Sequence, residues 1–256
     1  MNAPKTPGRL FLVPTPLDFA CAEQAPVSDV LPFSTLAIAA SLQHWVCENA
    51  KSTRAFLKRV NESHPLVAPL AEQKITELPR HVHKKGDHQS GFDGKPLLTA
   101  ALQGHDVGLI SEAGMPAVAD PGSSVVRAAH DLGITVVPLV GPVSLLLALA
   151  ASGLNGQNFA FIGYLPQDAA ERGARLKQLE SLALKTGQTQ LWIETPYRNA
   201  AMLSGLLQSL QANTRLAIAS GLTLPSAHIQ SHTVAQWKKG LKGPDGHTPA
   251  VYAIGP

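Results

Sequence analysis

Short apolar runs alternate with segments of helical periodicity along most of the chain. This alternation is typical of α/β proteins, in which helices cover the sheet that the strands form. The apolar runs predict strands over 9–13, 44–46, 107–110, 134–137, 159–162, 191–194, 215–219 and 250–254. The segments between them predict helices over 34–43, 51–60, 96–102, 121–132, 144–151, 169–184 and 199–210.

The pattern is least regular around the strand at 107–110. Residues 61–94 carry little apolar periodicity and many His, Lys, Gly and Asp residues, so we expect a long loop there. After the strand, Asp120 is expected to cap a helix whose first residue is Pro121. Gly133 is placed to end that helix.

A division near residues 115–121 fits this order of elements. It predicts an N-terminal α/β domain over 1–116 and a C-terminal α/β domain over 117–256, the second built on a mixed sheet. A ligand held at the division would lie between the two domains.

Composition narrows the class of protein. Hydrophobic residues make up 45% of the 256 residues and charged residues 15%, which supports a sizeable core. The net charge of +3 permits an anionic partner without requiring one. Cys21 and Cys47 follow no metal or disulfide spacing and predict reduced thiols. No signal-peptide pattern is present and the most apolar stretch, 143–151, is too short for a bilayer, so we expect a cytoplasmic protein without a membrane partner.

Candidate chemistry gathers at strand ends. The motifs GxGxxG, GxxxxGK[ST] and GxSxG do not occur, which disfavours the common nucleotide cradles and the hydrolase elbow. Four turns instead place proline or small residues where a strand stops, at 13–16, 111–116, 139–144 and 194–196. Each alone could simply end a strand. Because small residues let a ligand approach the backbone, four such turns together favour a shared ligand.

Three charged features have alternative interpretations. Glu48 is either a proton acceptor or a carboxylate that favours the start of helix 51–60. Lys51, Arg54 and Lys58 share one face of that helix, which is typical of a solvated face. The basic run 80–88 could be a solvated loop, a loop that touches phosphate or a metal site. It lacks cysteine and helical histidine spacing, so no metal site is predicted.

Four segments, taken in order, are specific to a known family: SEAGMPAVADPG (111–122), VVPLVGPVSLLLALAASGL (136–154), FAFIGYLP (159–166) and IETPYR (193–198). Together they resemble the tetrapyrrole methylase superfamily of S-adenosylmethionine-dependent enzymes. Within it, the pattern is most similar to the branch of ribosomal RNA small-subunit methyltransferase I and its shorter relatives. The resemblance is dense from about 106 to 200 and thinner at 9–16, 44–57 and 250–256. It implies two α/β domains with the methyl donor in the cleft between them, usually in a homodimer.

The resemblance also implies roles for single residues. Glu48 and Glu194 become the candidate catalytic carboxylates, since a ribose hydroxyl must lose a proton during methylation. Lys51, Arg54 and Arg198 become the candidate contacts to an anionic substrate. The residues implied to bind the cofactor S-adenosylmethionine are Pro14, Ser111, Glu112, Ala113, Gly114, Met115, Gly141, Pro142, Val143, Ser144, Tyr164, Thr195, Pro249 and Ala250.

Several positions depart from the pattern of the ribosomal branch. Glu112 replaces Asp, Met115 replaces Thr, and residues 48–51 read Glu-Asn-Ala-Lys in place of Glu-Asp-Thr-Arg. The donor-side turns are thus better preserved than the substrate side. The sequence predicts a methyltransferase that acts on RNA, most simply on a ribose 2′-oxygen of small-subunit ribosomal RNA. A small, tetrapyrrole-like acceptor and a catalytically silent donor-binding protein are the alternatives.

Overall fold

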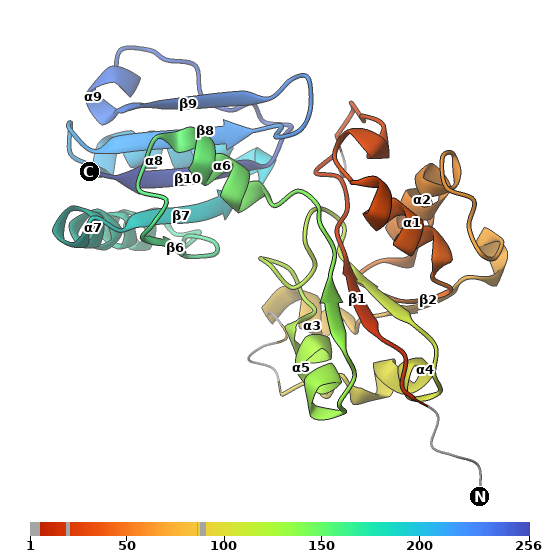
Figure 1. Cartoon of the computed structure of the whole chain (residues 1–256). Helices are drawn as coiled ribbons and strands as arrows, with labels where there is room; N and C mark the ends of the chain where they lie inside the picture. Colours follow the sequence, from red (N-terminus) through yellow and green to blue (C-terminus); the bar gives the residue numbers. More distant parts are fainter. Residues whose placement is uncertain (1–5, 19–20, 86, 88–90) are drawn as a thin grey trace, which may run out of the picture. The chain divides into compact units, whose positions relative to one another are not determined.

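A computed structural model describes residues 6–18, 21–85, 87 and 91–256. Of the described residues, 6–18 and 25–142 form one unit, and 21–24 with 143–256 form a second. Each unit is built on its own five-stranded sheet (Figure 1). The strands of the first sheet are β1 (Leu10–Val13), β2 (His44–Cys47), β3 (Lys74–Glu77), β4 (Val107–Ile110) and β5 (Val136–Pro138). The helices of this unit are α1 (Phe33–Ser41), α2 (Ala50–Asn61), α3 (Arg80–Lys85), α4 (Thr99–Leu102) and α5 (Ser123–Asp131).

The first sheet is parallel throughout and has the strand order β3-β2-β4-β1-β5. Side chains alternate between its two faces, as the pleat of a strand requires. On one face, Phe11 and Trp45 pack with α1 and α2. On the other face, Leu10 and Leu109 pack with α4 and α5. The connections that leave β1 and β4 therefore cover opposite faces of the sheet, which makes these neighbouring strands its topological switch point.

A glycine makes room for the largest side chain of this core. Gly108 of β4 lies beside Trp45 of β2 in register, and a Cβ built on Gly108 would come within 2.6 Å of the Trp45 ring. Trp45 is buried, and its indole N–H donates to Gln73 at 2.9 Å. Glycine at this strand position follows from the volume of the indole beside it.

The second unit has a mixed sheet of order β6-β7-β10-β8-β9. Its strands are β6 (Phe159–Phe161), β7 (Thr189–Glu194), β8 (Arg215–Ser220), β9 (His228–Thr233) and β10 (Ala250–Gly255). Its helices are α6 (Ser144–Ser152), α7 (Ala169–Thr186), α8 (Asn199–Ser209) and α9 (Val234–Trp237). Only β6 and β7 pair in parallel, so the mixed sheet expected for the second half is confirmed. The core packs α7, α8 and α9 against the sheet, with Trp237 of α9 in one cluster with Trp192 and Tyr252.

The division between the units falls later than the expected boundary between residues 116 and 117. β5 pairs with β1 over Leu10↔Val136 to Leu12↔Pro138, and α5 contributes Val125 and Ala129 to the first core. The segment after residue 116 thus completes the first sheet before the chain enters the second unit at α6.

The segment 61–94, expected to be a long loop, contains regular structure. β3 extends the sheet beyond β2, and α3 follows it. β3 is an edge strand with mostly exposed side chains, which is why its sequence, KITE, shows no apolar signal. Of the run 80–88, Gly86 and His88 lie outside the described residues.

The cap of α5 also differs from the expectation. The helix begins at Ser123 rather than Pro121, so Asp120 is not its cap. The carboxylate of Asp87 takes that role from a distant part of the chain. Its oxygens accept from the Gly122 N–H at 2.9 Å, the Ser124 N–H at 2.7 Å and the Ser123 hydroxyl at 2.7 Å. These bonds hold the pKa of Asp87 below its ordinary value although burial acts to raise it.

Asp87→Asn is expected to destabilise the first unit by about 1–3 kcal/mol, because the charged cap bonds two backbone N–H groups of α5. The difference in unfolding free energy between wild type and Asp87→Asn should be present near neutral pH. It should vanish as acid protonates Asp87, since the pKa of Asp87 is lowered in the folded protein. Urea unfolding of both proteins at pH 7 and pH 3 measures this. A difference that stays constant with pH would contradict the charged cap. Asp93→Asn, a change in an exposed turn, is the control.

Candidate functional site

Two of the predicted turns meet at the switch point of the first sheet. Thr15, after β1, and Gly114, after β4, form a reciprocal backbone pair: Thr15 N–H donates to Gly114 O at 2.9 Å, and Gly114 N–H donates to Thr15 O at 3.1 Å. The Thr15 hydroxyl also donates to the carbonyl of Ser111 at 3.4 Å. Gly114 has φ +77°, a backbone conformation that favours glycine. The turns 13–16 and 111–116 are thus one backbone structure.

The third turn, after β5, joins them. A Cβ on Gly141 would come within 2.3 Å of Pro14, so only glycine lets these turns pack this closely. The Pro142 carbonyl lies 3.5 Å from where a Gly114 Cβ would be. The first unit therefore brings together the predicted donor residues Pro14, Gly114, Gly141 and Pro142.

The connection between β4 and α5 is strained where it leaves these turns. Ala117 and Ala119 have φ +64° and +65°, in the left-handed region that alanine rarely adopts. Such backbone costs about 1–3 kcal/mol per residue and is concentrated at functional sites. The strain follows directly after Met115, at the end of the predicted donor turn.

Carboxylates surround the carboxyl ends of β2 and β4. Glu48 follows β2, while Glu112 and Asp120 come from the connection after β4. Burial and the charges of Asp120 and Glu112 raise the pKa of Glu48 to about 8. Burial, with a contribution from Glu112, raises the pKa of Asp120 to about 6, and the Ser111 hydroxyl offsets part of that rise. Glu48 Oε1 is buried and accepts no hydrogen bond from any described residue. This cluster is short of positive charge.

The residues of the first unit fit a cationic ligand. The turns 13–16, 111–116 and 139–142 contain no Lys or Arg, and the adjacent carboxylates lack an ionic partner among the described residues. A methyl donor of the sulfonium type carries a positive charge next to its reactive carbon, and such a charge is compatible with this neutral and acidic environment. Among the described residues, no three His, Cys, Asp or Glu side chains are placed to hold a metal ion.

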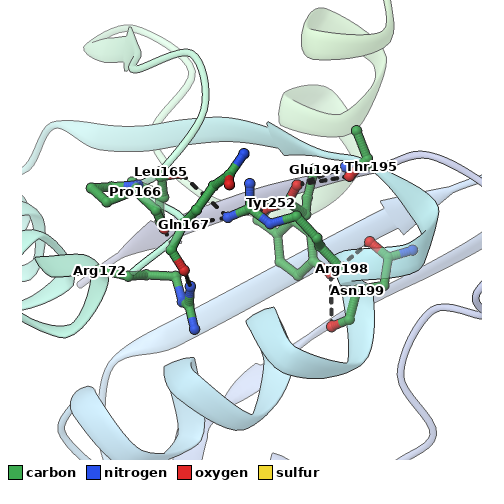
Figure 2. A network of polar contacts seen from close by, with 9 residues as sticks. All are labelled: Leu165, Pro166, Gln167, Arg172, Glu194, Thr195, Arg198, Asn199 and Tyr252. Carbon is green, nitrogen blue, oxygen red and sulfur yellow. Dashed lines mark hydrogen bonds and ion pairs between the residues drawn. The ribbon is translucent and has the colours of Figure 1, made fainter. Parts of the chain in front are cut away.

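Glu194, the other predicted catalytic carboxylate, lies in the second unit in a different environment (Figure 2). It is buried at the end of β7, where Oε1 accepts from the Thr195 N–H at 2.8 Å and the Thr195 hydroxyl at 3.2 Å. Oε2 pairs with the Arg198 guanidinium at 3.2 Å. A carboxylate with these partners ties β7 to the segment that follows it.

Arg198 is likewise bonded to groups of its own unit. Besides Glu194, its guanidinium donates to the carbonyls of Leu165 at 3.4 Å and Pro166 at 3.3 Å, as Figure 2 shows. It thereby fixes the segment after β6 that follows Tyr164, whose side chain is exposed. The geometry gives Arg198 a positioning role within the second unit rather than that of an open anion contact.

Asn199, which the sequence analysis did not single out, organises the far side of this network. Its amide group donates to the carbonyls of Asp245 at 2.8 Å and Thr248 at 3.0 Å and accepts from the Tyr252 hydroxyl at 3.1 Å. These bonds position the chain that leads into Pro249 and Ala250, and Ala250 is in register with Glu194. The sequence could not indicate this role, because the partners of Asn199 lie some fifty residues away in the chain.

The remaining predicted residues occupy simple positions. Val143 precedes α6 and Ser144 begins it. Lys51 and Arg54 are exposed on α2 near Glu48 in the chain, so their side chains are available to a solvent-borne ligand. Glu112, Ala113 and Met115 are half-buried in the turn after β4.

Comparisons with known proteins lead to the same family that the sequence resembles. The family described as Tetrapyrrole (Corrin/Porphyrin) Methylases matches residues 37–237 of this chain. The chain belongs to that family. Its structure resembles the crystal structure of the methyltransferase CobJ with a TM-score of 0.54 at 16% identity, covering 97% of this chain and 94% of the other. At that identity the likeness concerns the fold, and it confirms the two-domain α/β prediction.

Several relatives by sequence carry the same name. Ribosomal RNA small subunit methyltransferase I of Mesorhizobium japonicum is 37% identical over 148 residues, which is 58% of this chain and 49% of the relative. The protein of the same name from Xylella fastidiosa is 30% identical over 213 residues, covering 83% and 67%. The matched region spans about half the length of several of these relatives.

Among the described residues, none of the helices combines the length and apolar character that crossing a bilayer requires.

The carboxylate cluster predicts how stability depends on pH. Between pH 4.5 and about 8, the folded protein keeps a proton on Glu48 that the unfolded chain releases, so stability falls as pH rises through this window. Glu48→Gln removes that loss, and its melting temperature relative to wild type should rise from pH 5 to pH 8.5. Glu62→Gln, at an exposed site after α2, is the matched control. If the difference in melting temperature between Glu48→Gln and wild type does not change with pH, Glu48 does not hold a proton in a buried cluster.

Proposed function

We propose that this protein is an S-adenosylmethionine-dependent methyltransferase that acts on RNA, most simply on a ribose 2′-oxygen of small-subunit ribosomal RNA. The observation that carries the proposal is the joined set of turns at the switch point, locked by the Thr15–Gly114 pair and free of cationic side chains. Membership of the tetrapyrrole methylase family supports methyl transfer as its chemistry.

The donor supplies an electrophilic methyl group, and the chain contributes binding and orientation. In this proposal the backbone and small side chains of Pro14, Ser111 to Met115, Gly141 and Pro142 hold the donor in the first unit. Val143, Ser144, Tyr164, Thr195, Pro249 and Ala250 contribute from the second. Because methyl transfer is an in-line displacement, holding the reacting atoms in place supplies much of the rate.

Glu48 is the stronger candidate for proton acceptor. It lies in a cluster short of positive charge, with a buried oxygen that no described residue bonds. Glu194 instead accepts two hydrogen bonds at Oε1 and has an ion pair with Arg198 at Oε2. A cationic ligand near the cluster would lower the pKa of Glu48 and so favour its ionised form. In that form Glu48 can accept the proton that a ribose hydroxyl loses when its oxygen is methylated.

RNA as the acceptor draws support from the relatives' name and from surface charge. The relatives are named ribosomal RNA small subunit methyltransferase I. Lys51 and Arg54 are exposed on α2, three residues apart on one face. Phosphate contacts of this kind are what place an RNA segment before a reacting group. A homodimer and a cytoplasmic location remain predictions that accompany this proposal.

The direct test supplies labelled donor and small ribosomal subunits from cells that lack the protein. We expect label on a ribose 2′-oxygen, located by nuclease digestion and mass spectrometry. Glu48→Gln should slow the transfer by about 100-fold or more while donor binding, measured by calorimetry, persists. Glu62→Gln should transfer at the wild-type rate.

Two results would reject the proposal. Label in a small-molecule fraction of a cell extract, with none in RNA, would favour a small acceptor. Donor binding without transfer to either fraction would favour a catalytically silent protein.

Phosphate contact through α2 predicts a specific salt dependence. If Lys51 and Arg54 each contact one phosphate, Lys51→Gln with Arg54→Gln should weaken binding of a ribosomal RNA fragment and lower the salt slope of log K by about two. Fluorescence anisotropy between 50 and 200 mM salt, roughly the range over which such contacts weaken, measures the slope. The exposed pair Lys238 and Lys239, changed to Gln together, is the matched control. Equal slopes for both double variants would exclude a specific role for α2.

A further inference from the structure

A groove between α7 and α8 has no role in the site described above. It has a volume of about 290 Å³ and is lined mainly by small residues, among them Gly173, Ser204, Gly205 and Ser209, together with Arg172. All of these residues belong to the second unit. Small residues alone would merely let the two helices approach each other, so the significance of the groove depends on Arg172.

Arg172 is a buried cation that has no anionic partner among the described residues. Its residue is only 9% exposed, and Nη1 donates to the carbonyls of Pro166 at 3.2 Å and Gln167 at 2.8 Å (Figure 2). Its Nε–H is buried and has no acceptor among the described residues. No described carboxylate lies within ion-pair distance of the guanidinium.

Two other shielded arginines of the chain differ in this respect. Arg59 pairs with Asp18 at 2.7 Å, and Arg198 pairs with Glu194 at 3.2 Å. Both also donate to backbone carbonyls, so carbonyl contacts accompany a carboxylate in these cases and do not replace it. Since a buried charge is costly without a counter-charge, Arg172 lacks what its counterparts have.

Glycine at position 205 leaves the buried, unpartnered nitrogen without an α8 side chain packed against it. A Cβ built on Gly205 would lie 3.5 Å from Arg172 Nε and within 4 Å of nothing else outside its own helix and chain neighbours. The lining also includes the hydroxyls of Ser204 and Ser209, which can donate hydrogen bonds. The groove therefore combines a buried cation, an N–H donor that has no acceptor among the described residues, and hydroxyl donors in a small volume.

We propose that the groove between α7 and α8 binds a phosphoryl group, one oxygen of which accepts from Arg172 Nε. Several donors around a single guanidinium suit a group with three or four oxygens better than a carboxylate with two. The site would supply Arg172 with a counter-charge, which no described residue provides. This inference is independent of the proposed function, because it uses none of the residues assigned to donor or acceptor.

Gly205→Ala is the decisive variant. The added methyl group makes only ordinary van der Waals contact with Arg172 Nε, so it covers this nitrogen without strain. Alanine in place of glycine within α8 also favours the helix, so the variant is expected to fold. Arg172→Lys keeps the charge and removes the Nε–H. Lys177→Gln, at an exposed position on the same helix, is the control for general electrostatics.

The experiment titrates the full chain with inorganic phosphate and follows the Arg172 Nε–H resonance by NMR, at constant ionic strength set with chloride. We expect a saturable shift in the wild type and in Lys177→Gln, where the resonance is likewise visible. Gly205→Ala should bind about tenfold or more weakly, the loss of one charge-assisted hydrogen bond. Arg172→Lys has no Nε–H, so its phosphate binding is monitored through the backbone amide resonances of α8. It should show the same loss of affinity.

Three outcomes would overturn the proposal: no saturable shift in the wild type, undiminished binding by Gly205→Ala, or saturation by acetate but not by phosphate. A further arm adds a short single-stranded RNA to the phosphate-bound protein. Displacement of phosphate would support the proposal with the backbone of a nucleic acid as the source of the phosphoryl group. Retention would support it with a small phosphorylated molecule as the source.

Discussion

The reciprocal backbone pair between Thr15 and Gly114 is the constraint on which the first unit's candidate site depends. β1 and β4 are neighbours whose following segments run to opposite faces of the sheet, which would otherwise leave their carboxyl ends diverging. The pair joins these ends through main-chain atoms, so it needs no particular side chain at either position. It does require a positive φ at residue 114, which glycine supplies. With the turns joined, Gly141 can bring the third turn against Pro14, and the strained connection through Ala117 and Ala119 begins from a fixed point.

The two candidate catalytic carboxylates show how environment separates identical side chains. Glu48 lies among other acids and holds its proton at neutral pH, while Glu194 is surrounded by donors and an arginine. The first environment can respond to a cation that arrives, because ionisation of Glu48 is then favoured. The second is already neutralised and instead fixes the chain after β6 through Arg198. The same residue type thus supplies a responsive group in one unit and a rigid support in the other.

Much of the fold followed from the sequence because its inner strands are short, largely apolar runs bounded by polar or turn-forming residues. The predictions for β1, β2, β4, β7 and β10, and for α2 and α6, agree with the structure to within a residue or two. Edge strands β3 and β9 were missed, since a strand with exposed side chains lacks apolar alternation. The cap of α5 was assigned to the nearby Asp120, whereas Asp87 fills it from a segment that looked like a loop. Local patterns could indicate that several turns bind one ligand. They could not indicate that Asn199 or Arg172 is buried, because that burial depends on residues distant in sequence.

The pairing of β5 with the outer side of β1 has a consequence for dissecting the chain. A fragment ending at residue 116 would leave β1 as an unprotected edge, with the unpaired backbone of a buried, apolar strand open to other chains. A fragment ending at residue 142 retains β5 and closes that side of the sheet. The position at which the polypeptide is cut therefore decides whether the first unit is obtained as a monodisperse sample or as an aggregate.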